Sequence, residues 1–312
     1  MALSTPRTVG GRTAADITKG VTGGGRRDVK GKLVEAVLVL ALLGSLVILA
    51  VLIVDLLRRS WPVWTERPGD FLSGPLNSSN AAEAGVWQGI KGTLELALVV
   101  IVVAIPLGVS CAVYLEEYAG RSKLAAFTRL NVRNLAGVPS IVYGLLGLAL
   151  FVQFFDLGRT IWAGGLALSV LVLPIVIITA SEALRAVPYS VREGAFGVGA
   201  TRWETVRSHV LPAAAPGILT GVVLSLARAA GEAAPILLVG AATGLLRTGD
   251  QSFFEQFGSA FTAMPVIIFS YARQPGDDFR EITAAASIVL LVMVLLMNGL
   301  AIWLRNRYER KW

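Results

Sequence analysis

The sequence predicts an all-α membrane protein with six transmembrane helices, and three observations carry this prediction. Hydrophobic residues make up 54% of the 312 positions, and the mean hydropathy is +0.67, as in membrane proteins. Six apolar runs are each long enough to cross about 30 Å of hydrocarbon. Lys and Arg are unevenly divided between the two sides that these runs define, with 19 on one side and 8 on the other. This asymmetry places both termini in the cytoplasm.

The apolar runs divide the chain into tails, spans and loops. Residues 1–32 lack apolar periodicity and are expected to form a disordered cytoplasmic tail. A first transmembrane helix follows at 33–57, and then an external loop at 58–92 whose tryptophans suit a membrane interface. The region 93–304 carries the other five spans. They are expected at 93–115, 135–155, 161–180, 217–242 and 283–304, before a cytoplasmic tail at 305–312.

Two of the connecting loops within this region are long. The loop at 181–212 is expected in the cytoplasm, and the loop at 243–282 is expected outside. The outer loop contains an apolar run at 264–272, which is too short to span a bilayer. This run predicts an interfacial or re-entrant helix, either a cap over the bundle or a gate that contacts a partner.

The residues and motifs that several kinds of functional site require are missing from this sequence. One histidine and one cysteine cannot build a His/Cys metal site or an intrachain disulfide. The sequence contains no phosphate-binding G-x-x-x-x-G-K-[ST] loop, no H-E-x-x-H and no serine elbow. We therefore expect no enzyme acting alone. The net charge of +7 reflects basic cytoplasmic loops rather than binding of nucleic acid.

The central cytoplasmic loop predicts two short helices joined by an elbow. Gly197 and Gly199 stand between the helices, where a sharp turn favours residues without a Cβ. Pro212 is expected to end the second helix. Trp203 shares an apolar helical face with residues 206 and 210. A helical hairpin with such a face can dock another protein, and the alternative is an ordinary amphipathic loop.

Both predicted helices of this loop have capping-box spacing at their N-termini. Ser190 precedes Glu193 by three residues, and Thr201 precedes Glu204 by three. In each pair the hydroxyl can accept a hydrogen bond from the helix backbone while the glutamate closes back onto the cap. We therefore expect the helices to begin near residues 190 and 201.

An arginine lies near the centre of the fifth span, where a charge is costly in lipid. Glu232 follows Arg228 by four residues and can pair with it on one helical face. The same face holds small or polar residues, including Ser225. We expect the pair to face the bundle interior or a pathway, and a static ion pair that only fixes helix packing is the alternative.

The central loop resembles the EAA loop of ABC-importer permeases, whose pattern is E-A-A, three residues, G, nine residues, I-x-L-P. The matching positions depart from the pattern twice, with glycine for an alanine and histidine for the isoleucine. In that family the loop inserts into a cleft of a separate ATPase subunit. The resemblance therefore implies an ATPase-coupling role for this loop (residues 181–212, hereafter the coupling loop). The residues concerned are Glu193, Gly194, Ala195, Gly199, His209, Leu211 and Pro212, with Trp203 on the apolar face.

Further motifs resemble the A-type (PstA-like) permease subunits of ABC phosphate importers. They are R-x-x-G-E followed by proline at 228–235, G-V-P-S-I-V-Y-G at 137–144, the run 106–118 and F-T-A-M-P at 261–265. The resemblance implies a MetI-like permease fold and passage of inorganic phosphate past Arg228, Glu232 and Ser225. The implied partners are a C-type sister permease in a heterodimer, an ATPase homodimer that binds ATP and Mg, and an external phosphate-binding protein.

Three other functions stay open at the level of sequence. The nearest is a permease for another oxyanion, such as sulfate or molybdate. A channel or secondary transporter would use the charged pair as a gate or proton relay, but it would have no need of an ATPase dock. A structural membrane protein with a buried ion pair would show no flux in reconstituted vesicles with any set of partners.

Overall fold

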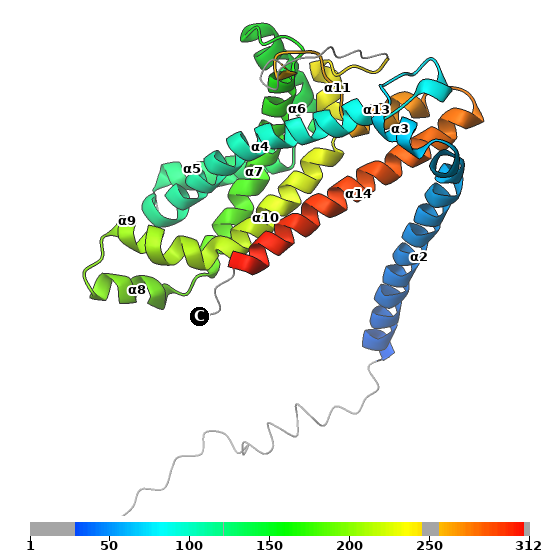
Figure 1. Ribbon diagram of the computed structural model, residues 1–312. Coiled ribbons are helices and arrows are strands. Elements are labelled where there is room, and N and C mark those ends of the chain that lie inside the picture. The colour runs from blue at the N-terminus through cyan, green and yellow to red at the C-terminus, as the bar shows by residue number, and fades with distance from the viewer. Residues whose placement is uncertain (1–28, 121, 245–255, 309–312) are drawn as a thin grey trace, which may run out of the picture. The chain divides into compact units, whose positions relative to one another are not determined.

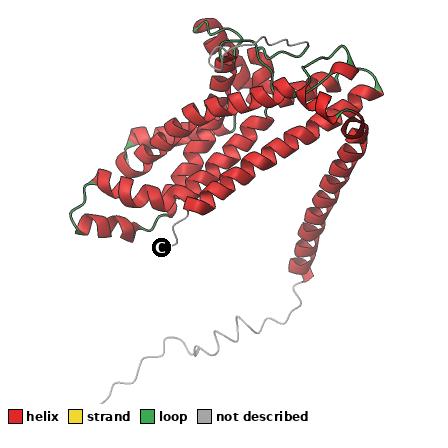
Figure 2. Cartoon of the chain, viewed as in Figure 1, coloured by secondary structure: helices red, strands yellow, loops and turns green. Residues whose placement is uncertain are grey.

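Long apolar helices account for most of the chain in the computed structural model, which describes residues 29–120, 122–244 and 256–308. Within these ranges every element of regular secondary structure is a helix (Figure 2). Five helices are long and apolar enough to cross a membrane, and a bent pair makes a sixth span if it is counted as one. This confirms the predicted fold class of an all-α membrane protein.

The chain forms two units, Met1–Asp55 and Leu56–Trp312, which we describe separately. In the first unit helix α2 (Val29–Glu66) begins, and its apolar side chains are exposed along this part. The helix is longer than the expected span at 33–57: it starts within the predicted tail and continues past Arg58 and Arg59. Both arginines are good helix formers, so the end of the apolar run does not end the helix. The rest of the predicted disordered tail, 1–28, lies outside the described residues.

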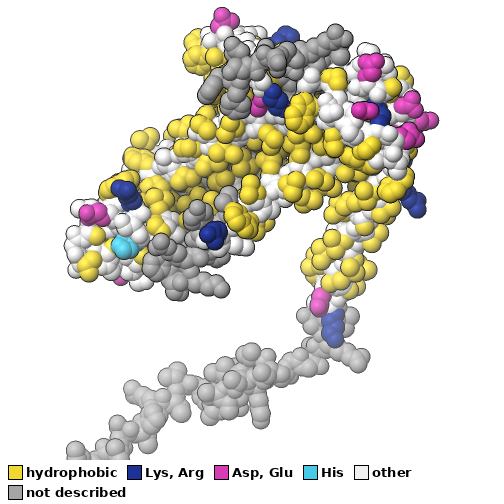
Figure 3. All heavy atoms as spheres, viewed as in Figure 1, with side chains coloured by type: hydrophobic (Ala, Val, Ile, Leu, Met, Phe, Trp, Pro, Cys, Tyr) yellow, Lys and Arg dark blue, Asp and Glu magenta, His cyan; other side chains and the backbone are white. Residues whose placement is uncertain are grey.

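In the second unit, four long helices form a bundle. They are α4 (Trp87–Val113), α7 (Ile161–Ala186), α10 (Leu211–Gly231) and α14 (Asp277–Tyr308), and they run side by side in Figure 1. Helices α4 and α7 approach closely because α7 carries glycine at the contact: a Cβ on Gly165 would lie 2.6 Å from the side chain of Val99. Figure 3 shows hydrophobic side chains over the middle of this bundle and charged ones towards its ends.

The third predicted span is broken rather than continuous. Helix α5 (Lys123–Ala136) precedes α6 (Ser140–Gly147), which continues as the π-helix η3 (Leu148–Phe154), and the two parts meet at 102°. The expected span at 135–155 therefore loses its first turn to the break. Pro139 explains this, because the residue before a proline is disfavoured in the helical conformation. The amphipathic helix α5 was expected only as a loop.

The fifth predicted span, 217–242, is also broken. Helix α10 ends at Gly231, Glu232 is extended with a ψ of 118°, and the short helix α11 (Ala234–Val239) follows. A proline at 235 in a continuous helix would clash with the carbonyl of residue 231, and glycine at that position lowers helix propensity further. Prolines inside α4 and α7 are accommodated without a break.

The outer loops pack as a second hydrophobic cluster at the other end of the bundle from the coupling loop (Figure 1). Helix α3 (Pro68–Ser73), the 3-10 turn η1 (Ala81–Glu83) and helix α13 (Met264–Ala272) contribute to it or flank it. Helix α13 is the short apolar segment predicted at 264–272. Its Tyr271 is fully buried and donates a hydrogen bond of 2.7 Å to the carbonyl of Gly85.

Candidate functional site

The coupling loop folds as the predicted helical hairpin. Helix α8 (Tyr189–Gly197) leads into a turn at 198–201, and α9 (Arg202–Thr205) begins after it. Gly199 has a φ of 87°, a conformation that favours glycine, and its N–H donates to Phe196 across the turn. Thr201 and Glu204 form the predicted capping box: the Thr201 N–H donates to Glu204 Oε2 at 2.8 Å, and the Glu204 N–H donates to Thr201 Oγ1 at 3.3 Å.

Two sequence expectations for this loop are wrong. Ser190 and Glu193 do not form a capping box, because the N-cap of α8 is Pro188, two residues before Ser190, and the helix has no side-chain cap. Pro212 does not end the second helix either. Helix α9 continues through the π-helical turn η4 (Val206–Val210) into α10, with the proline at the start of α10. The wider π-helical turn gives the proline ring room, so the helix passes it without a break.

Most of the motif residues lie on the surface of the coupling loop. Two motif residues are less accessible: Ala195 is buried and Leu211 is half-buried. Large apolar side chains are also exposed beside the motif residues, and Val198 has 86% of its surface accessible. Exposed apolar side chains that gather in a polar loop are typical of a surface for a protein partner or a membrane. The exposed motif residues are Glu193, Gly194, Gly199, Trp203, His209 and Pro212, and the other exposed apolar residues are Tyr189 and Phe196.

A buried ion pair attaches α8 to the end of α4. Arg192 of α8 contacts Glu117 at 2.6 Å, and only 13% and 9% of their side chains are exposed. The same guanidinium donates to the carbonyls of Leu184 and Val187, each at 2.9 Å. Glu117 lies in the π-helical turn η2 (Tyr114–Tyr118), which extends α4. Sequence reasoning counted Arg192 only as a basic loop residue, and nothing local in the sequence marks Glu117 as its partner.

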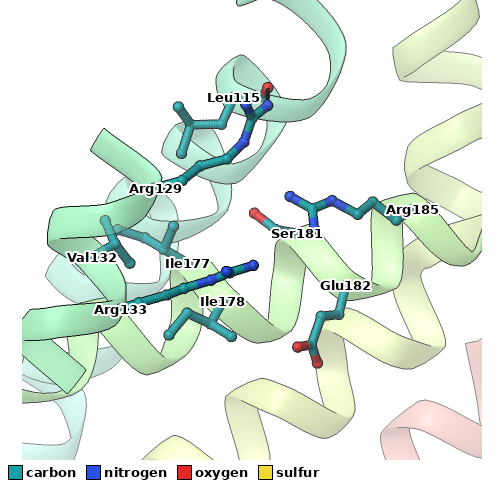
Figure 4. A pocket seen from close by; sticks show the side chains of 9 residues that line it. All are labelled: Leu115, Arg129, Val132, Arg133, Ile177, Ile178, Ser181, Glu182 and Arg185. Carbon is teal, nitrogen blue, oxygen red and sulfur yellow. Dashed lines mark hydrogen bonds between the residues drawn. The ribbon is translucent and has the colours of Figure 1, made fainter. Parts of the chain in front are cut away.

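The neighbouring Glu116 joins three elements at the same end of the bundle. Arg185 of α7 holds its two carboxylate oxygens at 2.8 and 2.7 Å, and Arg129 of α5 contacts it at 3.5 Å. Both arginines line the pocket shown in Figure 4. Together with the Arg192 pair, these contacts connect the coupling loop to α4, α5 and α7.

The structure brings Arg228 and Glu232 together at the end of α10. Arg228 Nε lies 3.4 Å from Glu232 Oε1, and the glutamate is the extended residue where the helix breaks. The arginine side chain is 49% exposed and the glutamate 19%, so the pair lies at the surface of this chain rather than inside its bundle. Of the two expected environments, the bundle interior of this chain does not hold the pair, and a pathway along its surface stays a prediction.

Ser225 does not join the charged pair. Its side chain is buried, and its hydroxyl donates to the carbonyl of Gly221 one turn earlier on the same helix, at 2.8 Å. The helix break was not predicted either, although Gly231 and Pro235 together could have indicated it. The break places the Glu232 carboxylate beside the guanidinium, at the point where helical backbone bonding stops.

The chain matches the family of binding-protein-dependent transport system inner membrane components over residues 104–311. Similar proteins include phosphate transport system permease protein PstA 1 of Mycobacterium tuberculosis, at 34% identity over 80% of this chain and 77% of that protein. PstA of Yersinia pestis is 36% identical over 71% and 72% of the two chains. The probable ABC transporter permease protein YqgI of Bacillus subtilis is 33% identical over 75% and 82%.

The fold is also similar to that of a chain in an inward-facing structure of the MetNI methionine ABC transporter. The TM-score is 0.55 at 19% sequence identity, over 72% of this chain and 95% of that chain. This likeness confirms the MetI-like permease fold. The chain belongs to the family of binding-protein-dependent transport system inner membrane components, and it is a multi-pass protein of the bacterial inner membrane.

Proposed function

We propose that this chain is the A-type membrane subunit of an ATP-driven importer of inorganic phosphate. Several relatives at 31–36% identity carry the name of a phosphate transport permease, and the alignments cover 70–80% of this chain. The observation that carries the proposal is the surface pair of Arg228 and Glu232 at the break of α10. ATP and Mg would be bound by a separate ATPase dimer, which docks on the exposed coupling loop.

The geometry of the pair suits brief binding of an oxyanion. A planar guanidinium offers paired N–H donors to phosphate oxygens, which compensates the charge of the ion in a low-dielectric pathway. At 3.4 Å the contact to Glu232 is loose, so the carboxylate balances Arg228 in the empty state and releases it when phosphate arrives. A static pair that only fixes packing is favoured less, because half of the arginine side chain contacts no other part of this chain.

The exposure of Arg228 also supports a second membrane subunit. A charge within a membrane-spanning segment that faced lipid would be costly, so the exposed side of α10 needs a protein or aqueous neighbour. A C-type sister permease would cover this face and complete the pathway from its own side. An external phosphate-binding protein would deliver the ion to the outer end of the two subunits.

Reconstitution of the complete complex tests this function. We expect uptake of labelled phosphate into vesicles that contain the chain, the sister permease, the ATPase and the binding protein, and no uptake of sulfate or molybdate. Arg228→Gln should abolish uptake while the complex still assembles and hydrolyses ATP. Arg280→Gln breaks a largely exposed pair with Asp277 and serves as the control, with normal uptake. Normal phosphate uptake by the Arg228→Gln complex would refute the assigned pathway.

If Arg228→Gln instead lowers the yield of intact complex in membranes, the pair is structural. Truncating one partner of a structural ion pair leaves the other charge uncompensated, which destabilises the protein. Transport and assembly must therefore be measured on the same membranes. Uptake of sulfate in preference to phosphate would assign the chain to the other oxyanion class.

A further inference from the structure

A pocket at the coupling-loop end of the bundle lies between α5, α7 and the end of α4 (Figure 4). Its lining divides into a polar and an apolar part. The side chain of Arg133 extends from α5 across the pocket towards α7 in this view. The polar part consists of Arg129, Arg133, Arg185, Ser181 and Glu182, and the apolar part consists of Leu115, Val132, Ile177 and Ile178.

Two donor side chains of this pocket make neither a hydrogen bond nor an ion pair in the described part of the chain. Ser181 is 7% exposed, and its hydroxyl makes no hydrogen bond there. Arg133 makes no ion pair or hydrogen bond there either, whereas the other two arginines both contact Glu116. A hydroxyl that lines a pocket and makes no hydrogen bond to the protein can donate to a ligand that supplies an acceptor.

The charges facing the pocket favour an anion. Three guanidinium groups and the Glu182 carboxylate line the pocket, and Glu116 pairs with two of the arginines from outside the lining, so one positive charge is uncompensated. Guanidinium N–H groups and a hydroxyl are the donors that bind phosphate oxygens best. The free donors lie on α5 and α7, so an anion between them would be held by both helices.

The surroundings of the pocket indicate where such an anion comes from. Helix α5 is amphipathic, and its Leu124, Phe127 and Leu130 are exposed. The basic residues place this end of the bundle at the cytoplasmic surface of the membrane. A pocket lined by both basic and apolar side chains at that depth suits the phosphate of a lipid head group, with apolar side chains beside it.

We propose that this pocket binds a phosphate group at the cytoplasmic membrane surface, with Arg133 and Ser181 as its principal donors. The apolar part of the lining favours the head group of an anionic phospholipid as the source, and free inorganic phosphate offers the same chemistry. The bound group bridges α5 and α7 beside the ion pairs of Glu116. This binding site requires only that the chain is a membrane protein with this end in the cytoplasm. It does not depend on which substrate the chain transports.

Binding measurements on the intact purified complex test the site and its source. Short-chain phosphatidylglycerol is titrated into the detergent-solubilised complex, and phosphatidylcholine is titrated in a separate series. Native mass spectrometry counts the lipid molecules bound to each complex. Labelled inorganic phosphate is titrated in a parallel series. We expect Arg133→Gln to weaken phosphatidylglycerol binding about fivefold, as for the loss of one basic residue at an anionic lipid. Ser181→Ala should weaken it in the same direction.

Lys123→Gln is the matched control, since it removes one positive charge from α5 outside the pocket and should leave binding unchanged. A loss of inorganic phosphate binding in Arg133→Gln, with lipid binding intact, would assign the site to the free ion instead. The proposal would be overturned if wild-type, Arg133→Gln and Ser181→Ala complexes bound phosphatidylglycerol equally well and also bound inorganic phosphate equally well. Because both variants change side chains that hold no other described group, their assembly should be normal.

Discussion

Gly199 shows how one backbone conformation positions a docking surface. Its φ of 87° turns the chain between α8 and α9, and a Cβ there would meet no other atom within 4 Å. We predict that Gly199→Asp leaves insertion intact, because the left-handed strain costs only about 1–2 kcal/mol. The new carboxylate would nevertheless stand on the surface that docks the ATPase. Phosphate uptake should therefore be lost while ATP hydrolysis becomes independent of the binding protein.

The control for this prediction is Gly276→Asp. Gly276 also has a positive φ, of 111°, and open space around it, but it lies in the turn before α14 in the outer loop region. The two variants share the backbone strain and the added charge. If coupling fails equally in both, strain rather than docking is responsible. Wild-type uptake by a well-expressed Gly199→Asp protein would exclude this part of the loop from the dock.

Tyr271 is a residue whose ionisation is linked to folding of the outer cluster. Burial raises the pKa of Tyr271 to about 12, above the usual value near 10. The unfolded chain therefore loses this proton first as the pH rises, so stability should fall above pH 10 and reach its new level above pH 12. Tyr271→Phe removes this pH dependence. It also leaves the Gly85 carbonyl unpaired, at a cost of about 1–3 kcal/mol at pH 7.

Thermal unfolding of the two proteins between pH 7 and pH 12 measures this effect. Other tyrosines and lysines also titrate in this range, so the informative quantity is the difference between wild type and Tyr271→Phe. The difference should shrink as the pH rises. A difference that is constant with pH would mean that the hydroxyl is not buried in solution.

At the scale of elements, the Arg192–Glu117 pair attaches α8 to the end of α4, and we expect coupling to depend on this attachment. Arg192→Gln would leave the Glu117 carboxylate, of which only 9% is exposed, without its partner. We predict a destabilisation of about 3 kcal/mol and a loss of coupling between ATP hydrolysis and uptake. The measurements are the melting temperature of the complex and the ratio of ATP hydrolysed to phosphate transported.

Arg207→Gln provides the matched control, because this arginine lies in the same loop, is exposed and makes no described ion pair. The charge-reversed double variant Arg192→Glu with Glu117→Arg should recover part of the lost stability. A melting temperature that is equal for wild type and Arg192→Gln would show that the pair contributes nothing to the attachment.

The elements themselves were predictable to the extent that local patterns decide them. Apolar runs indicated α4, α7 and α14, and the spacing of Thr201 and Glu204 indicated the start of α9. The breaks before Ser140 and Ala234 were missed, because a proline within a membrane helix can also be accommodated, as Pro174 is in α7. Local sequence cannot distinguish these cases, since neighbouring helices decide whether the freed carbonyl groups find partners.

The candidate site was predictable only where its residues are close in sequence. The pair of Arg228 and Glu232, four residues apart, could be found from spacing, and the glycine elbow from composition. The contacts of Glu116 and Glu117 join residues up to 75 positions apart, so no periodicity marks them. Spacing could not decide between the two expected environments of Arg228, because its 49% exposure depends on how α10 packs in the folded chain.

At the scale of the whole molecule, the roles assigned to the two ends of the bundle depend on one orientation. The coupling loop and the pocket at Arg133 must lie in the cytoplasm, and the cluster around Tyr271 must lie outside. The division of Lys and Arg into 19 and 8 supports this orientation. A reversed chain would present the loop to the wrong compartment, where no ATP-driven partner could reach it.

Cysteine labelling in intact cells tests this orientation in a background where Cys111, the single native cysteine, is replaced by alanine. Ser208 lies exposed in the coupling loop and Ser79 lies exposed in the outer region, so a serine-to-cysteine change at each gives a matched pair. A membrane-impermeant maleimide added outside should label the Ser79→Cys protein and spare the Ser208→Cys protein. Permeabilised cells should label both, which verifies that the second cysteine is accessible. Strong labelling of Ser208→Cys in intact cells would reverse the topology, and with it the sites assigned to ATPase docking and to cytoplasmic phosphate groups.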